Sequence, residues 1–295
     1  MAAPAMPKAR RGDAQRQPLH IPKPRASAPC QGQRTSNMLK VLIFLFTCSF
    51  AAQTMAEDRV LAELLAQHGV TGTMVIASLQ GAQTFIHNDT RAHQPFTPAS
   101  TFKILNTLIA LEEKVVVEQG TAFKWNGHPY SIPDWNRDQT LESAFRASCV
   151  WCFQELARRI GARNYRDYLE KCAYGHWREP FVDTTFWLDG SLLISAVEQV
   201  EFLKRVYRRT LPFSASSYDT LRRIMLVEQT PTFTIRAKTG LGGSSKPQVG
   251  WYVGYVETTQ DVWFFATNLA IENPGELPLR LQLTRAALQA KGVFD

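Results

Sequence analysis

Residues 98–111, PASTFKILNTLIAL, place Ser100 three positions before Lys103 at the start of an apolar helix. Residues three apart in a helix share one face, so the hydroxyl and the amine become neighbours after one turn. Serine becomes a nucleophile when a base removes its proton, and lysine serves as that base once burial or a nearby charge lowers its pKa. The stretch therefore predicts a nucleophile with an adjacent base. On its own, Ser100 is also consistent with a simple helix N-cap.

Two further motifs accompany this pair. Chance predicts about half a Ser-x-x-Lys match in a chain of this composition, so the pair alone carries little weight. A Lys-Thr-Gly triplet lies downstream at 238–240, where chance predicts only about 0.05 such triplets. Ser-Cys-Val lies between them at 148–150. We interpret the three motifs together as one ordered catalytic constellation.

The N-terminal 56 residues carry the whole charge excess of the chain. They hold eight Lys or Arg residues against a single acid, Asp13, and the net charge of the full chain is +7. Residues 57–295 are therefore formally neutral. Nucleic-acid binding needs a basic patch or stripe, so we expect no nucleic-acid partner.

The N-terminal segment is typical of a leader rather than of a folded domain. Residues 1–37 are rich in Pro, Arg, Gln and Ala and predict a disordered extension. Residues 38–56 combine a charged start, a short apolar run and small residues, which predicts a signal peptide cleaved after Ala56 and a periplasmic protein without membrane contact. The apolar run is shorter than the about 20 residues that span a bilayer. An uncleaved anchor and lipid attachment at Cys48 are the alternatives to a cleaved signal peptide. A translation start at Met38 would leave residues 1–37 untranslated and would keep the signal peptide.

The remaining region, 57–295, is long enough for one large domain and holds Cys149, Cys152 and Cys172. An odd number of cysteines in an oxidising compartment argues against a disulfide framework, although one bridge is possible. A Cys-x-x-Cys pair is too small for a structural zinc site, and the strand-to-helix context of a thioredoxin motif is missing. We expect the cysteines to serve in packing and expect no metal site.

Hydrophobic patterns predict strands at both ends of this region with helices between them. The expected helices near the ends and the start of the insert are 58–68, 101–111 and 277–290. The expected strands are 72–79, 83–87, 233–239, 250–256 and 262–268. The middle, 121–226, shows no strand-like alternation and is expected to be mostly helical. The fold class is therefore α/β (α+β), an antiparallel sheet built from the N- and C-terminal parts, flanked by helices, with an inserted all-α subdomain.

The motifs together resemble the class D (oxacillinase-type) serine β-lactamases of the penicillin-recognising enzyme superfamily. The resemblance spans 57–295 and rests on STFK at 100–103, SCV at 148–150, YGH at 174–176, FWLDG at 186–190, KTG at 238–240 and LPLR at 277–280. Class A enzymes have Ser-Asp-Asn as the second motif, which this chain lacks. The resemblance implies the penicillin-binding transpeptidase-like fold, a small-molecule β-lactam substrate, hydrolysis through an acyl-enzyme, and β-lactam resistance.

The resemblance also implies the residues of the acylation step. Ser100 attacks the β-lactam carbonyl, and the backbone N–H groups of Ser100 and Leu241 form the oxyanion hole, with Gly240 allowing close approach. A hydroxyl at a helix N-terminus supports this role, because backbone dipoles there favour a developing negative charge. Ser148 relays a proton to the departing nitrogen, assisted by the charge of Lys238.

Lys103 is implied to be the general base in a modified form. Its neighbours in the sequence are apolar, so burial is expected to lower its pKa and to leave a neutral amine. In class D enzymes this amine reacts with CO2 to give an N-carboxylated lysine, and no other cofactor is implied. Trp187 matches the residue whose indole N–H donates to the carbamate, and Val150 is expected beside them. Arg280, with Thr239, is implied to hold the substrate carboxylate.

Two alternatives share the acylation residues. A penicillin-binding transpeptidase or carboxypeptidase deacylates very slowly, and a β-lactam-sensing receptor domain stays acylated; the carbamate base and Trp187 favour hydrolysis. The third motif ends in His176 where the family usually has Asn, and we assign this histidine no catalytic role. Spacing fixes neither the β-lactam substrate range, which depends on loops around Trp125, Tyr130 and Tyr174, nor the oligomeric state.

Overall fold

The computed structural model describes residues 57–80, 83–116, 120, 122–243 and 246–295. The predicted disordered extension and signal peptide, which together form 1–56, lie outside the described residues. Within the described ranges, none of the helices has the length and apolar character needed to cross a bilayer.

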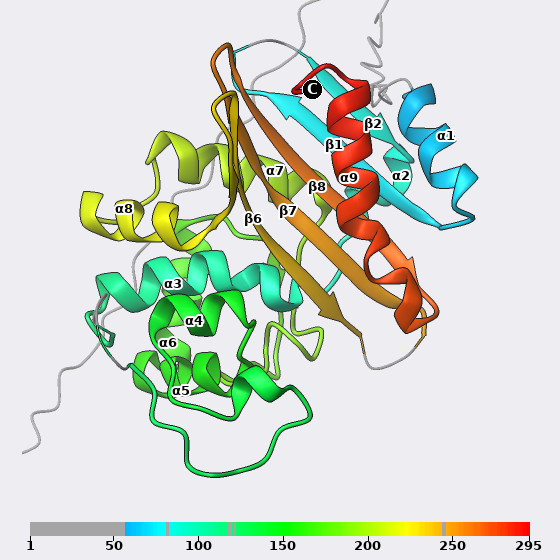
Figure 1. Cartoon of the computed structure of the whole chain (residues 1–295). Helices are drawn as coiled ribbons and strands as arrows, with labels where there is room; N and C mark the ends of the chain where they lie inside the picture. Colours follow the sequence, from blue (N-terminus) through cyan, green and yellow to red (C-terminus); the bar gives the residue numbers. More distant parts are fainter. Residues whose placement is uncertain (1–56, 81–82, 117–119, 121, 244–245) are drawn as a thin grey trace, which may run out of the picture. The chain divides into compact units, whose positions relative to one another are not determined.

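A six-stranded antiparallel sheet with the order β2-β1-β8-β7-β6-β5 forms the centre of the domain (Figure 1). Its strands are β1 (Gly72–Ser78), β2 (Thr84–His87), β5 (Leu226–Gln229), β6 (Phe233–Gly242), β7 (Gln248–Thr258) and β8 (Val262–Ile271). β1 pairs along its whole length with β8, with Val75 opposite Ala266. The N- and C-terminal parts therefore complete one sheet, which confirms the prediction.

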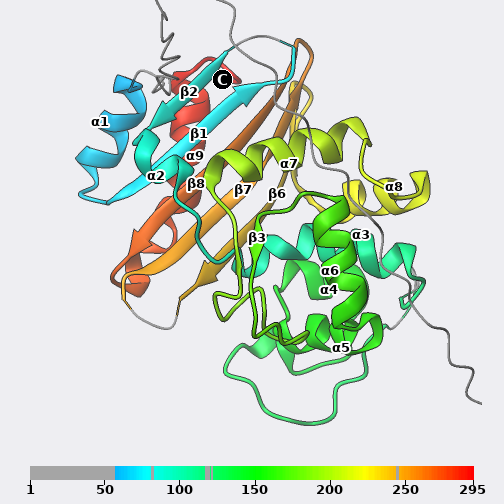
Figure 2. The same ribbon diagram turned by 180° about the vertical axis from the view of Figure 1, so that it is seen from behind.

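Helices cover both faces of this sheet (Figures 1 and 2). α1 (Arg59–Gln67) and α9 (Leu279–Ala290) pack on one face, and α7 (Ala196–Arg208) packs on the other. Successive residues of a strand point to opposite faces, so Met74 joins the cluster under α1 and α9 while Val75 joins the cluster around the remaining helices.

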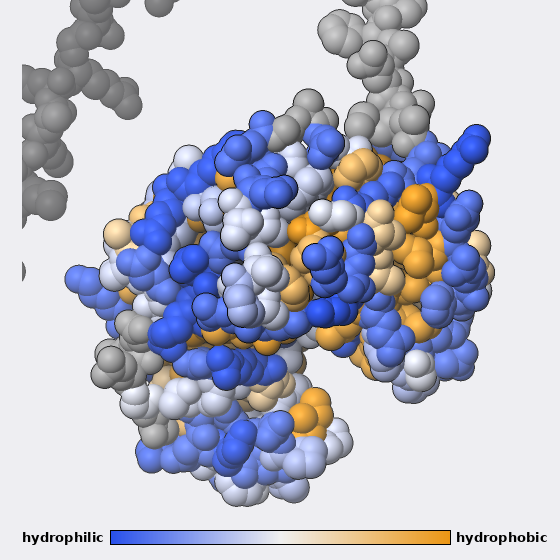
Figure 3. All heavy atoms as spheres, turned by 45° about the horizontal axis from the view of Figure 1, so that its top comes forward, coloured by the Kyte–Doolittle hydropathy of each residue, from blue (hydrophilic) through white to orange (hydrophobic). Residues whose placement is uncertain are grey.

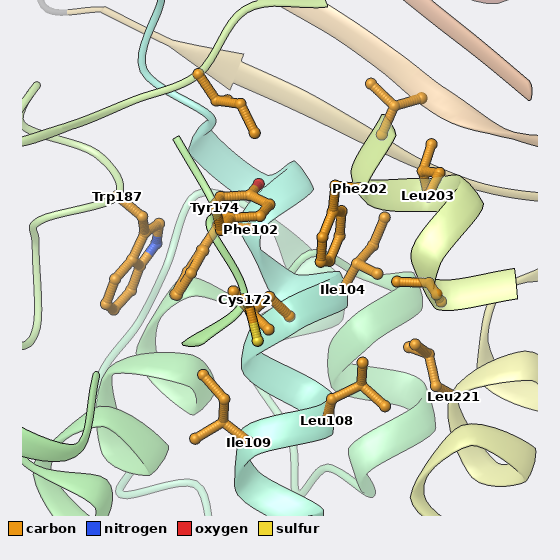
Figure 4. Packing of buried hydrophobic residues seen from close by; sticks show 14 of the residues in the cluster. Phe102, Ile104, Leu108, Ile109, Cys172, Tyr174, Trp187, Phe202, Leu203 and Leu221 are labelled. Carbon is orange, nitrogen blue, oxygen red and sulfur yellow. The ribbon is translucent and has the colours of Figure 1, made fainter. Parts of the chain in front are cut away.

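The helical insert surrounds α3 (Lys103–Glu112), in which every residue as far as Ala110 is buried. Such a helix, enclosed on all sides, lies inside the core rather than on its surface. Figure 4 shows its apolar side chains against those of α7 and the neighbouring segments. The other helices and 3-10 turns are α2 (Asp89–His93), α4 (Leu141–Arg146), α5 (Val150–Ile160), α6 (Ala162–Lys171), α8 (Ala215–Ile224), η1 (Ala99–Phe102), η2 (Pro133–Trp135) and η3 (Pro274–Glu276).

The structure adds elements that the sequence did not predict and moves the start of one helix. The edge strand β5 and the short helix α2 were not expected. The insert contains a pair of short antiparallel strands, β3 (His176–Trp177) and β4 (Leu192–Leu193). Strands of two residues are too short to show an alternating pattern in the sequence. The apolar helix begins at Lys103 rather than at Thr101, because the preceding residues form the 3-10 turn η1. Ser100 therefore lies in a tight turn ahead of the helix.

The structure settles the disulfide state of the three cysteines, which the sequence left open. Cys149 and Cys152 form a disulfide, with their Cα atoms 5.5 Å apart, whereas Cys172 is free and buried. Cys149 is the N-cap of α5 and Cys152 lies three residues later in its first turn, so the helix itself brings the two sulfur atoms together. The spacing was compatible with one bridge but did not require it.

Polar side chains dominate the face shown in Figure 3, with apolar side chains gathered in places. The large apolar side chains that stay exposed in the described part are Val60, Ile132, Val182, Val227, Leu241 and Leu281. Two of these, Val227 and Leu281, line a cavity that Lys238 and Thr239 of the Lys-Thr-Gly motif also line. Both side chains are therefore exposed at the edge of the candidate active site.

Candidate active site

Ser100 lies in η1, where the backbone is fixed on both sides of it. The N–H of Ala99, which has φ 48°, donates to the carbonyl of Trp187 at 3.0 Å. The N–H of Thr101 donates to the carbonyl of Pro98 at 3.1 Å. The Ser100 hydroxyl is thus held in a defined position at the beginning of the buried helix.

The Lys103 amine lies beside the Ser100 hydroxyl, as the spacing predicts. Its Nζ donates to Ser100 Oγ at 3.1 Å. Lys103 is fully buried, and its Nζ lies 4.8 Å from the centre of the Phe153 ring. Burial first, and the positive charge of Lys238 second, hold the pKa of Lys103 well below its usual value. The side chain can therefore be a neutral amine, which is able to accept a proton or to react as a nucleophile.

Ser148 meets Lys238 on the other side of the site. Ser148 lies between α4 and α5 in the left-handed conformation, with φ 55°. Lys238 extends from β6, and its Nζ donates to Ser148 Oγ at 2.8 Å and to the Thr239 carbonyl at 3.1 Å. Burial, followed by the charge of Arg280, lowers the pKa of Lys238 to about 7. A proton at this amine is therefore exchangeable near neutral pH.

Gly240 lets β6 lie close to the turn that carries Ser100. A Cβ at this position would lie 3.1 Å from the carbonyl oxygen of Pro98 and 3.2 Å from Cγ2 of Thr101. The neighbouring edge strand, β5, pairs with β6 only as far as Arg236, so the following part of β6 has no strand on that side. Leu241 lies on this open part and is 37% exposed.

Trp187 contributes both its backbone and its indole to the site. Its carbonyl accepts from the Ala99 N–H and from Thr97 Oγ1, each at 3.0 Å. The indole is fully buried and stacks on Phe102 with ring centres 5.8 Å apart (Figure 4). Among the residues that the structure describes, no acceptor faces its N–H. A buried unpaired donor is costly and marks a place where an acceptor fits. Val150, the first residue of α5, is half-buried beside Ser148.

Arg280 joins the site from the beginning of α9. Its Nη1 donates to the carbonyl of Gly240 at 2.5 Å, which anchors the guanidinium on β6. Its Nε is buried and has no partner within the described ranges. Burial lowers the pKa of Arg280, yet a guanidinium stays charged at any physiological pH. The arginine can therefore present positive charge and free donors to an anionic group near Thr239.

A cavity of about 420 Å³ adjoins Lys238 and Thr239. Its other walls come from Phe145 and Arg146 of α4, from the strand β5, and from Tyr252 and Leu281. The mixture of apolar walls with a few charged groups is typical of a small-molecule site. Of the predicted site residues, Lys238 and Thr239 line this cavity, whereas Ser100, Lys103, Ser148 and Arg280 do not.

Two residues of the third motif lie away from this chemistry. His176 is exposed, with 76% of its side chain accessible, and its Nε2 lies 3.2 Å from Glu198 Oε1. Tyr174 is fully buried and packs against Phe102 and Phe202 (Figure 4).

Three aromatic residues near the predicted catalytic groups were not singled out from the sequence. Trp135 Nε1 donates to the carbonyl of Ala147 at 2.9 Å, and Trp151 Nε1 donates to the carbonyl of Trp135 at 3.1 Å. These bonds tie η2 to the turn before Ser148. Phe153 faces Lys103, as described above. Trp151 and Phe153 lie in the helix that follows Ser148, so helical spacing could have predicted that they lie near the site. The position of Trp135 depends on the path of its loop, which spacing does not predict.

The chain is similar to proteins of one family. The family model for the penicillin binding protein transpeptidase domain matches residues 72–289. Beta-lactamase OXA-48 of Klebsiella pneumoniae is 39% identical over 228 residues, which cover 77% of this chain and 86% of that protein. Beta-lactamase OXA-10 of Pseudomonas aeruginosa is 34% identical over 257 residues, covering 86% and 97%. The solved class D beta-lactamase FUS-1 (OXA-85) from Fusobacterium nucleatum subsp. polymorphum has a TM-score of 0.79 at 31% identity, covering 81% of this chain and all of that one.

Proposed function

The chain belongs to the class D β-lactamases, and from this premise we propose that it hydrolyses the β-lactam amide of penicillins and related antibiotics through an acyl-enzyme on Ser100. One observation supports the proposal most strongly: the fully buried Lys103 amine donates to the Ser100 hydroxyl at 3.1 Å. A serine paired with a neutral amine is an activated nucleophile. Production of such an enzyme would confer resistance to β-lactams.

In acylation, the Ser100 hydroxyl proton moves toward the Lys103 side chain while Oγ attacks the lactam carbonyl. Negative charge develops on the carbonyl oxygen, and we assign the backbone N–H groups of Ser100 and Leu241 to stabilise it. Gly240 supports this assignment, because its missing side chain leaves room for β6 close to the Ser100 turn. The lactam C–N bond then breaks, which leaves the acyl group on Ser100.

The departing nitrogen needs a proton, and Ser148 is placed to supply it. Ser148 Oγ accepts from Lys238 Nζ at 2.8 Å, so a proton given up by the hydroxyl is replaced from the lysine. The pKa of Lys238, about 7, suits this exchange at neutral pH. Arg280 and Thr239 are assigned to the substrate carboxylate, with the buried Nε of Arg280 and its anchor on Gly240 as support.

We further propose that Lys103 carries a carbamate formed from CO2. Two features of the site fit this group. A neutral buried amine reacts with CO2 whereas an ammonium does not, and the indole N–H of Trp187 is a buried donor with no acceptor in the described part of the chain. When present, the carbamate supplies a general base for acylation and for hydrolysis of the acyl-enzyme.

A chromogenic cephalosporin tests the function and separates it from its rivals. The proposal predicts many turnovers per molecule, and none for Ser100→Ala. A single burst equal to the enzyme concentration would instead indicate a slowly deacylating transpeptidase or a sensor domain. Repeating the assay with penicillin, oxacillin and a carbapenem would then define the substrate range.

We propose that the mature enzyme is periplasmic. The predicted signal peptide at 38–56 supports export, and the Cys149–Cys152 disulfide suits an oxidising compartment. Fractionation of expressing cells, followed by N-terminal sequencing of the periplasmic protein, tests this. The expected first residue is Glu57, and a protein found only in the cytoplasm would contradict the proposal.

A further inference from the structure

The Cys149–Cys152 disulfide joins the two positions of α5 that a capping box joins elsewhere in this chain. α4 and α7 begin with reciprocal side-chain bonds between the N-cap residue and the residue three positions later. In α5 the same two positions are cysteines, and Cys149 Sγ also accepts from the Cys152 N–H at 3.3 Å. The first turn of α5 is thus closed covalently, and both cysteines are fully buried.

This closed turn lies between contacts to both lysines of the site. Ser148 immediately precedes it and accepts from Lys238 at 2.8 Å. Phe153 immediately follows it, with its ring centre 4.8 Å from Lys103 Nζ. A change in the first turn of α5 therefore acts most directly on the Ser148 hydroxyl, which is bonded to Lys238 and is joined to the turn through one peptide bond.

Ser148 needs such support because its backbone is in an unfavourable conformation. Its φ of 55° lies in the left-handed region, which residues with a Cβ adopt only when the surroundings enforce it. The Cys149 N–H donates to the carbonyl of Ala144 at 2.9 Å, and the Ser148 N–H donates to that of Phe145 at 3.1 Å. Without the bridge, the N-cap of α5 would rest only on the hydrogen bond from the Cys152 N–H to Cys149 Sγ, and sulfur is a weak acceptor.

We propose that the Cys149–Cys152 disulfide is a positioning element of the reaction, which holds the Ser148 hydroxyl against Lys238 and thereby sets the rate of acylation. This inference rests on the proposed β-lactamase function. The bridge acts through Ser148 and touches no substrate. Loss of the disulfide lowers the acylation rate, because even a small displacement of a catalytic group strongly reduces the rate of the step it assists.

The test measures the acylation rate in variants without the bridge. Cys149→Ser/Cys152→Ala keeps an N-cap acceptor but lacks the covalent bond, and Cys149→Ala/Cys152→Ala lacks both. Stopped-flow acylation by a chromogenic cephalosporin is expected to slow roughly tenfold to hundredfold in both variants. The matched control is Cys172→Ala, which removes the buried free cysteine and leaves acylation unchanged. Wild-type rates in Cys149→Ser/Cys152→Ala would overturn the proposal.

A double-mutant cycle separates positioning from general destabilisation. In a Ser148→Ala background, removal of the bridge is expected to change acylation less than about twofold, because the hydroxyl that it positions is already absent. Equal losses in both backgrounds would mean that the bridge is merely structural. Melting temperatures of all variants confirm that each is folded at the assay temperature.

Reduction of the wild type provides a second measurement without substitution. A water-soluble phosphine takes oxygen from water as it becomes the phosphine oxide, and the disulfide gains two hydrogens to become two thiols. Acylation is expected to fall by the factor seen in the variants and to recover on reoxidation with oxidised glutathione. Unchanged acylation with both thiols free, counted by alkylation and mass spectrometry, would refute the inference alone. An oxidised wild type without any turnover would refute the proposed function as well.

Discussion

Replacement of Lys238 by methionine is expected to stabilise the protein while abolishing its activity. The pKa of this buried amine falls from 10.5 to about 7 on folding, and each unit corresponds to about 1.4 kcal/mol. Between pH 7 and 10.5 the unfolded chain therefore binds more protons than the folded one, so wild-type stability rises with pH across this window. Below pH 7 the charged amine costs the fold at most about 5 kcal/mol.

Methionine removes this cost but also removes the hydrogen bonds of Nζ to Ser148 and Thr239, worth about 1 kcal/mol each. The net gain at pH 6 is therefore about 2 to 3 kcal/mol, or roughly 4 to 12 °C in Tm for a domain of this size. At pH 10.5 the gain disappears, since the wild-type amine is then neutral in the folded protein and only half protonated in the unfolded chain. Turnover is expected to fall at least about a hundredfold, because Ser148 loses its proton source.

Chemical denaturation of wild type and Lys238→Met from pH 6 to 10.5 measures the effect directly. Lys171→Met, a change at an exposed lysine, serves as the control and should show no comparable dependence on pH. The reasoning is refuted if the stability difference between Lys238→Met and wild type is the same at every pH. It is also refuted if the variant is less stable at pH 6.

Lys103→Ala should stay folded by circular dichroism yet show little or no turnover, and full activity would contradict the assigned base. Wild-type activity should fall at acidic pH, since protonation of the Lys103 amine prevents its reaction with CO2, and added bicarbonate should partly restore it. Trp187→Ala should acylate but turn over at least about tenfold more slowly, as pre-steady-state bursts would show; unchanged turnover would remove its role. Arg280→Ala should raise KM at least about tenfold for substrates with the carboxylate and little for their methyl esters; equal effects on both would exclude the carboxylate contact.

Local patterns sufficed to predict the parts of the fold that depend on periodicity and on motif order. The strands at both ends of the chain alternate or are β-branched, and the apolar run after Lys103 is buried on all sides. The Ser100–Lys103 contact follows from one helical turn, so spacing alone predicted it. The Ser148–Lys238 contact joins residues 90 positions apart, and only the resemblance to a family indicated it.

The features that were missed depend on backbone conformation or on distant packing. The left-handed turn at Ser148 gives no signal in its residue type, because the conformation is enforced by α4 and α5. The disulfide depends on the N-cap geometry of α5, which Cys-x-x-Cys spacing does not determine. The packing of the buried Tyr174 against Phe102 joins segments far apart in the sequence, which motif spacing does not determine.

The most direct test of the central claim, that the buried Lys103 side chain is a neutral amine able to bind CO2, is carbon-13 NMR of active enzyme in labelled bicarbonate. The account predicts a carbamate resonance that is present in wild type, absent in Lys103→Ala and lost when acidification protonates the amine. A spectrum of active wild type that shows bicarbonate and dissolved CO2 alone would contradict it.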